Sequence, residues 1–158
     1  MSSNSAIIFV ICFCIAVSNG TGAKKVSSRF TFGNSTYEIS TNRAGWVQAK
    51  NDCRVKGMRL LSIESAEENN AVLENIVLMP GERFWTSGSD LGHEGAFYWE
   101  ATGHSVGPFI NWAPDQPDNA QSRSEHCIEL WHEANHLWND NKCDTQSLYI
   151  CEGHPCEE

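Results

Sequence analysis

The sequence predicts an α+β fold, with two helices in the first half of the chain and short strands in the second half. Two observations indicate this class. Before residue 80, apolar residues recur at the spacing of helices, whereas after Arg83 the chain consists of short, aromatic, strand-like segments rich in glycine. These segments are FWTSG, FYWEATG, FINW, HCIEL, HLWND and SLYICE. The chain has no internal repeat and no linker, so we expect a single domain.

The first predicted strand covers residues 30–40, where polar and apolar side chains alternate and Thr, Phe, Tyr and Ile are frequent. It contains the sequon Asn34-Ser35-Thr36, and an exposed edge strand would leave Asn34 accessible for glycosylation.

The first predicted helix covers residues 41–55, with apolar residues at helical spacing, and Gly57 closes it. The second helix begins at a capping box, in which Ser65 is the N-cap and Glu68 follows three residues later. The Pro80-Gly81 pair is expected to end it.

Residues 1–22 are expected to be a signal peptide that is cleaved between residues 18 and 23. The apolar run of residues 6–17 is too short to cross a bilayer, and Ala16 and Ser18 have the spacing of a signal-peptidase site. The alternative is a buried core helix, but nothing precedes this segment for it to pack against. We therefore expect a secreted, extracellular protein with no membrane insertion.

Residues 23–158 then form one domain with a core of about residues 30–152 and a short C-terminal tail. Five of the seven cysteines lie in this part, where an oxidising compartment favours disulfides. Five is odd, so one thiol is left over. The net charge of −9 argues against nucleic acid or an anionic membrane as the partner.

The segment between Gly103 and Glu125 is long and weakly periodic, and it contains three prolines. Loops of this kind in compact domains usually bind something or are organised by an ion. This loop and the nearby WND segment carry oxygen donors, which suit calcium better than zinc or copper. A cis Gln116–Pro117 bond would direct the side chains on either side of Pro117 the same way. The donors are Gln116, Asp118, Glu125, Asn139 and Asp140.

Together these segments resemble the C-type lectin domain, and most of all the short secreted lectins of arthropods. The resemblance rests on QPD at 116–118, a Glu two residues before Cys127, WND at 138–140, and YICE at 149–152. FWTSGSDLG at 84–92 and NW at 111–112 fit the same pattern. It implies a C-type lectin-like fold, with two helices packed on short antiparallel sheets, a long calcium-binding loop and two internal disulfides.

The resemblance also implies roles for individual residues. Cys53 would pair with Cys151 and Cys127 with Cys143, which leaves Cys156 for an interchain bond to a second copy or another lectin, or as a free or capped thiol. The five oxygen donors would bind Ca²⁺ and, through it, the sugar. QPD is the arrangement that the family associates with galactose-type sugars.

An auxiliary calcium site is implied at Asp90 and Glu94, with Glu125 as a bridge, although His126 stands where a further carboxylate would be expected. The function implied is calcium-dependent binding of galactose-type glycans on microbial or cell surfaces, in innate recognition. The alternative is a C-type lectin-like module that binds a protein ligand independently of sugar.

One motif points elsewhere, because residues 132–136 match the H-E-x-x-H signature of zinc proteases. That chemistry needs both histidines on one face of a helix, whereas this copy lies between two strand-like segments. We therefore expect no enzyme. His132 and His136 are instead candidate sugar contacts at a hairpin tip.

Overall fold

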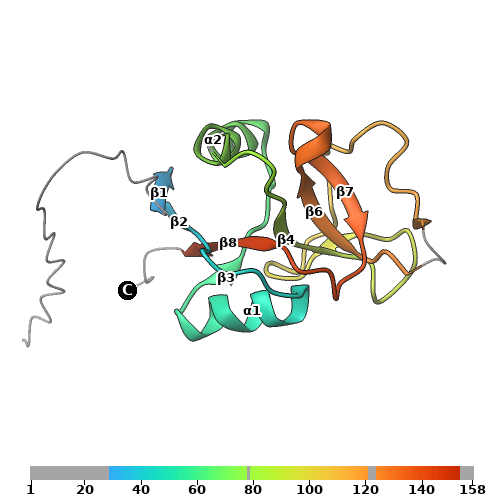
Figure 1. Cartoon of the computed structure of the whole chain (residues 1–158), viewed down its shortest axis with the longest axis horizontal. Coiled ribbons are helices and arrows are strands. Elements are labelled where there is room, and N and C mark those ends of the chain that lie inside the picture. The colour runs from blue at the N-terminus through green and yellow to red at the C-terminus, as the bar shows by residue number, and fades with distance from the viewer. Residues whose placement is uncertain (1–28, 78, 121–123, 154–158) are drawn as a thin grey trace, which may run out of the picture.

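A sheet whose main path runs β1-β2-β8-β4-β6-β7 organises the computed structural model, which describes residues 29–77, 79–120 and 124–153 (Figure 1). The predicted signal peptide and Cys156 lie outside the described residues. The strands are β1 (Arg29–Phe32), β2 (Ser35–Ile39), β3 (Arg59–Leu60), β4 (Phe84–Ser89), β5 (Tyr98–Trp99), β6 (Cys127–Trp131), β7 (Leu137–Asn141) and β8 (Leu148–Gly153). The helices are α1 (Trp46–Val55), α2 (Ala66–Ile76) and the 3₁₀ turn η1 (His132–Ala134).

Strand pairing is antiparallel throughout the described sheet except between β4 and β8, which run parallel. The sheet is therefore mixed rather than purely antiparallel as expected. The α+β class is confirmed, and Figure 1 shows α1 and α2 on opposite sides of β8. No helix among the described residues is long and apolar enough to cross a membrane.

The segment predicted as one strand, residues 30–40, is a hairpin of β1 and β2. Gly33 has a φ of +56°, a left-handed conformation that glycine adopts without a Cβ clash, and this reverses the chain. Asn34 follows in the turn and is exposed, which fits the predicted glycosylation. β2 then pairs with β8, so the two ends of the described domain lie at the same edge of the sheet.

Both helices differ from prediction at their ends. α1 begins at Trp46 rather than at residue 41, because Ala44 pairs with Ser147 through backbone hydrogen bonds of 2.9 and 3.1 Å. α2 has the predicted cap, in which the N–H of Glu68 donates to Ser65 Oγ at 3.1 Å. It ends at Ile76, one turn before the predicted stop.

The core has an aromatic centre at Trp138 of β7, which is fully buried. Trp99 and Phe109 meet its ring edge-to-face at 5.4 and 5.5 Å, and Trp112 does so at 5.8 Å. The backbone N–H of Ala113 also donates to the Trp138 carbonyl at 2.8 Å. These contacts fix the long loop against β7 immediately before the QPD segment.

Both predicted disulfides are present. Cys53–Cys151 joins α1 to β8, and Cys127–Cys143 joins the start of β6 to the segment after β7. The second bridge therefore closes the base of the β6–β7 hairpin, next to residues 125 and 140.

Candidate metal centre

Three of the predicted calcium ligands meet at one point. Asp118, Glu125 and Asp140 each offer a carboxylate oxygen, and these oxygens lie within 4.8 Å of one another. Glu125 and Asp140 are buried, with 5% and 1% exposure, whereas Asp118 is exposed. The cluster therefore has a buried floor and an open side, as a site needs if a ligand is to reach it from solvent.

The loop is folded around the carboxylate of Asp140. Its Oδ1 accepts the backbone N–H of Asp118 at 3.1 Å, and its Oδ2 accepts that of Asn119 at 2.8 Å. Asn119 has a φ of +45°, and its Oδ1 in turn accepts the N–H of Glu125 at 3.0 Å. Asp140 of β7 and the loop residue Asn119 thus hold the segments that carry the Asp118 and Glu125 carboxylates in place.

The cluster is electrostatically strained. Burial raises the pKa of Glu125, and the neighbouring charges of Asp140 and Asp118 raise it further. Burial also raises the pKa of Asp140, against the opposing effect of its backbone hydrogen bonds. Crowded carboxylates of this kind are relieved by a cation between them.

Two amide residues complete the predicted set. Gln116 precedes a cis peptide bond to Pro117, as expected, and its Oε1 is buried without a hydrogen-bond partner among the described residues. Asn139 donates from Nδ2 to Glu129 Oε1 at 3.2 Å, which leaves its carbonyl oxygen as the group available to a metal. The donor set is then entirely oxygen, with a buried amide oxygen that lacks a partner, and it fits calcium.

Glu129 was not among the predicted site residues; it lies opposite Asn139 in the β6–β7 pair and is fully buried. Arg83 contacts Glu129 Oε1 at 3.2 Å, the same oxygen that accepts from Asn139. Burial raises the pKa of Glu129, and hydrogen bonds from Asn141 and Asn139 and the charge of Arg83 oppose this shift. The sequence did contain a signal for a functional role of Glu129, namely a charged residue between Ile128 and Leu130 in the middle of a predicted strand. Glu129 orients Asn139 and is therefore a positioning residue.

The predicted auxiliary residues also come together, but with an imidazole as the third member. Asp90, Glu94 and His126 place one donor atom each within 4.8 Å of the others. His126 Nδ1 lies 2.9 Å from Asp90 Oδ1 and 3.6 Å from Glu94 Oε2. A nitrogen donor does not fit a calcium shell, which takes oxygen ligands.

The H-E-x-x-H segment does not form the helix that zinc-protease chemistry requires. It begins as the 3₁₀ turn η1, and His136 has a φ of +60°. Glu133 is held by the guanidinium of Arg83 at 2.6 Å.

The two histidines of this segment are also remote from the acidic cluster. The backbone N–H of Gly81 points at the imidazole of His132, at 3.1 Å from Nε2. Both histidines lie at the tip of the β6–β7 hairpin, beyond the Trp131–Leu137 pair. The Ile128–Asp140 pair lies three residues further along the strands from the Trp131–Leu137 pair, a distance of about 10 Å at the usual rise per residue. The structure therefore separates the candidate sugar contacts His132 and His136 from Asp140.

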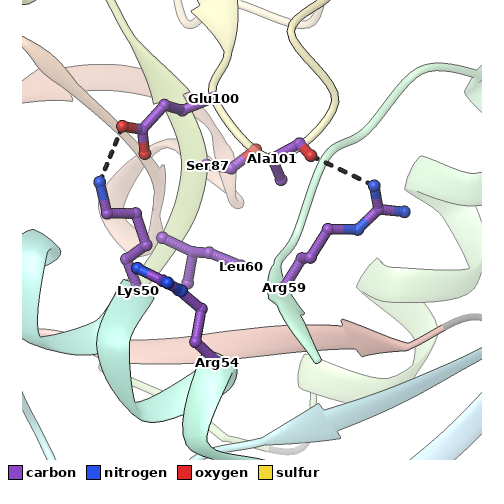
Figure 2. Close-up of a pocket in the computed structure, with 7 residues that line it drawn as sticks. All are labelled: Lys50, Arg54, Arg59, Leu60, Ser87, Glu100 and Ala101. Atoms are coloured by element: carbon purple, nitrogen blue, oxygen red, sulfur yellow. Dashed lines mark hydrogen bonds and ion pairs between the residues drawn. The ribbon is translucent and has the colours of Figure 1, made fainter. Parts of the chain in front are cut away.

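A separate hollow of about 310 Å³ lies between α1, β3, β4 and the turn after β5 (Figure 2). Figure 2 shows Lys50, Arg54 and Arg59 around it. Lys50 is ion-paired with Glu100 at 2.7 Å, and Arg59 donates to the Ala101 carbonyl at 3.2 Å. Its lining is cationic, so it is not a site for a metal cation.

Comparisons with known proteins identify the family of the chain. A family model described as the Lectin C-type domain matches residues 42–153. The chain is 37% identical over 121 residues to C-type lectin 37Db of Drosophila melanogaster, covering 76% of this chain and 78% of that protein.

Solved structures show the same fold. The mouse scavenger receptor C-type lectin carbohydrate-recognition domain superposes with a TM-score of 0.72 at 28% identity, covering 84% of this chain and 98% of the other. A calcium-independent type II antifreeze protein has a TM-score of 0.70 at 23% identity, covering 81% of this chain and 92% of the other, which shows likeness of fold alone.

The matching family model and the insect relatives are lectins, a non-enzymatic class of carbohydrate-binding protein, and the fold and both disulfides are those that the family resemblance implied. The chain therefore belongs to the C-type lectin domain family and is not an enzyme.

Proposed function

We propose that this protein is secreted and binds galactose-type glycans in a calcium-dependent manner. The observation that carries the proposal is the convergence of the Asp118, Glu125 and Asp140 carboxylates in an open-sided, half-buried cluster. The unpartnered Oε1 of Gln116 supports it, because an unsatisfied buried oxygen is costly unless a ligand contacts it.

Gln116, Asp118, Glu125, Asn139 and Asp140 would hold the ion. When bound, calcium would supply coordination positions for two neighbouring sugar hydroxyls. The chain's own groups would then select the sugar, because carboxylate oxygens accept hydrogen bonds from sugar hydroxyls and amide N–H groups donate hydrogen bonds to hydroxyl oxygens. Asp140 keeps the loop in register for this task through its two backbone contacts.

The order of amide and acid in Gln116-Pro117-Asp118 favours galactose-type over mannose-type sugars. Residues 119–124 contain no aromatic side chain to pack on the apolar face of the sugar. A missing platform of this kind costs on the order of 1–3 kcal/mol, so binding to a single site is weak. Weak single sites suit recognition of repeated glycans on microbial or cell surfaces, as in innate immunity, and gain from linkage of copies through Cys156.

The direct test is a calcium titration of the secreted protein followed by retention on galactose- and mannose-agarose, with elution by EDTA. The expected dissociation constant for calcium is roughly 10⁻⁴–10⁻³ M, as in other extracellular modules. Asp118→Ala should abolish both calcium binding and retention.

Asp115→Asn is the matched control, because Asp115 lies in the same loop but outside the cluster. This substitution should change neither calcium binding nor retention on the sugar column. Identical thermal stability in millimolar calcium and in EDTA would refute the proposal. Calcium binding without retention on any glycan would favour the alternative, a protein ligand.

A double substitution tests the sugar preference. Gln116→Glu with Asp118→Asn exchanges acid and amide but keeps three carboxylates, so calcium affinity should change little while the preference moves toward mannose. Ala120→Trp should strengthen galactose binding if the new ring reaches the sugar. A wild-type protein that prefers mannose on a glycan array contradicts the galactose assignment but not the lectin assignment.

A further inference from the structure

We propose that Asp90, Glu94 and His126 form a second metal site, which takes a borderline transition-metal ion of the Zn²⁺ type rather than calcium. This site is separate from the proposed calcium cluster, and it rests on its own geometry and chemistry. It replaces the auxiliary calcium site that the family resemblance implied.

The distances between donor atoms match a small tetrahedral ion. Zinc bonds to imidazole nitrogen and carboxylate oxygen are about 2.0–2.2 Å, so neighbouring ligands of a tetrahedral ion lie roughly 3.3 Å apart. The two distances from His126 Nδ1, 2.9 Å to Asp90 and 3.6 Å to Glu94, fall on either side of this value. The Glu94 side chain is 58% exposed and is free to adjust.

The fixed members of the site are already oriented. The Asp90 side chain is 1% exposed, and its second oxygen, Oδ2, accepts the backbone N–H of Gly95 at 2.7 Å. This hydrogen bond leaves Oδ1 directed at the imidazole. Metal-ligating side chains are commonly held in orientation by hydrogen bonds of this kind. The backbone N–H of Asp90 donates to the His126 carbonyl at 3.2 Å, so the two ligands are also tied to one another.

Ligand chemistry decides which metal the site prefers. Calcium takes six to eight oxygens, and a site of two carboxylates and one imidazole offers too few of them. One nitrogen and two oxygens with a remaining open position are an ordinary set for zinc. The imidazole is 26% exposed, so an ion can reach it from solvent.

A second histidine–carboxylate pair in the same protein provides the contrast. His104 Nδ1 lies 2.8 Å from Glu64 Oε1, but both side chains are largely exposed, at 72% and 43%. This pair belongs to none of the three-donor groups found among the described residues. It is therefore an ordinary surface contact and a matched control.

The test is a titration of the full secreted protein with Co²⁺ and with Zn²⁺, in about 5 mM calcium so that hard-cation sites are filled. Co²⁺ is followed by its visible absorption and Zn²⁺ by calorimetry. We expect one ion of either metal per chain at micromolar concentration. His126→Ala and Glu94→Gln should each weaken binding at least about tenfold, because each removes a ligand. His104→Ala should leave it unchanged.

A further variant tests the choice of metal. His126→Asp restores three carboxylates, so zinc binding should weaken and one additional calcium ion should bind in the absence of zinc. Glu94→Gln alters an exposed side chain and keeps the test valid if a His126 variant does not fold. The proposal is overturned if the wild type binds neither metal below about 100 μM. It is also overturned if His126→Ala and Glu94→Gln bind as the wild type does, or if thiolate–cobalt absorption assigns the ion to Cys156.

Discussion

Glu125→Gln should make the calcium-free protein more stable and at the same time abolish its response to calcium. Glu125 is 5% exposed and packed against the buried Asp140, with carboxylate oxygens no more than 4.8 Å apart. Glutamine has the same size and still offers an oxygen to the loop backbone. The substitution therefore removes a charge while keeping the packing.

The expected size follows from the geometry. Two unit charges at 4.8 Å repel by roughly 3 kcal/mol at an effective dielectric constant of 20, and solvent at the open side reduces this. We expect the variant to gain about 1–2 kcal/mol of unfolding free energy in EDTA. With a dissociation constant near 1 mM, about 10 mM calcium stabilises the wild type by roughly 1.4 kcal/mol. Calcium at the same concentration should not raise the unfolding free energy of the Glu125→Gln variant.

The effect depends on pH with a definite sign. Because the pKa of Glu125 is raised above 4.5 in the folded protein, the calcium-free fold holds this proton more tightly than the unfolded chain does. Its contribution to stability is therefore present below the ordinary pKa and is lost as pH rises through the raised value. The advantage of Glu125→Gln should be small near pH 4 and full near pH 7.5.

Urea denaturation of the wild type and of Glu125→Gln, at the two pH values and with EDTA or calcium, measures the stability in EDTA, the stabilisation by calcium and the pH dependence. Asp115→Asn again serves as the control, since it removes a loop charge outside the cluster. A Glu125→Gln protein that is less stable than wild type by more than about 1 kcal/mol in EDTA at pH 7.5 would refute the crowding argument.

Arg83→Ala should destabilise the protein by roughly 3 kcal/mol, because it leaves the fully buried Glu129 without its cation. Glu133→Ala, which breaks only the exposed half of the same network, should cost less than about 1 kcal/mol by urea denaturation. Replacing both Cys53 and Cys151 by Ser should cost more than the same change at Cys127 and Cys143, about 5 against 3 kcal/mol, since the bridged residues are 98 and 16 positions apart. The opposite ranking of melting temperatures would contradict the chain-entropy argument. Non-reducing electrophoresis should show a covalent dimer that Cys156→Ser removes, whereas a wild type that runs only as monomer rules the linkage out.

Local signals predicted much of the fold. The Ser65 cap and the exposed sequon at Asn34 were predictable from local patterns. The pairing of four cysteines was implied by the family resemblance and not by any local signal. The hairpin turn at Gly33-Asn34 was missed, because alternation continues across a two-residue turn and hides it. The start of α1 depends on Ala44 pairing with Ser147, a contact that no local pattern reveals.

In the candidate site, too, the features carried by motifs were predictable and those that depend on tertiary contacts were not. The sequence predicted the three carboxylates that converge, since each belongs to a motif. It did not predict that Glu129 would orient Asn139, because their contact depends on strand register and on Arg83. It made His132 and His136 candidate sugar contacts at a hairpin tip, but it did not predict that three residue pairs of β6 and β7 separate this tip from Asp140.

The position of the two chain ends has a consequence for how copies would be arranged. Both ends of the described domain lie at the β1–β2–β8 edge, whereas the acidic cluster lies beside β6 and β7 at the other end of the sheet (Figure 1). Cys156 follows Gly153 by three residues, a reach of about 10 Å. If copies are linked through Cys156 as proposed, the junction would lie near the β1–β2–β8 end of each domain, away from the proposed sugar site beside β6 and β7. A pair with that geometry bridges two separate particles more readily than it grips one, so a covalent dimer would act as a cross-linker that agglutinates cells.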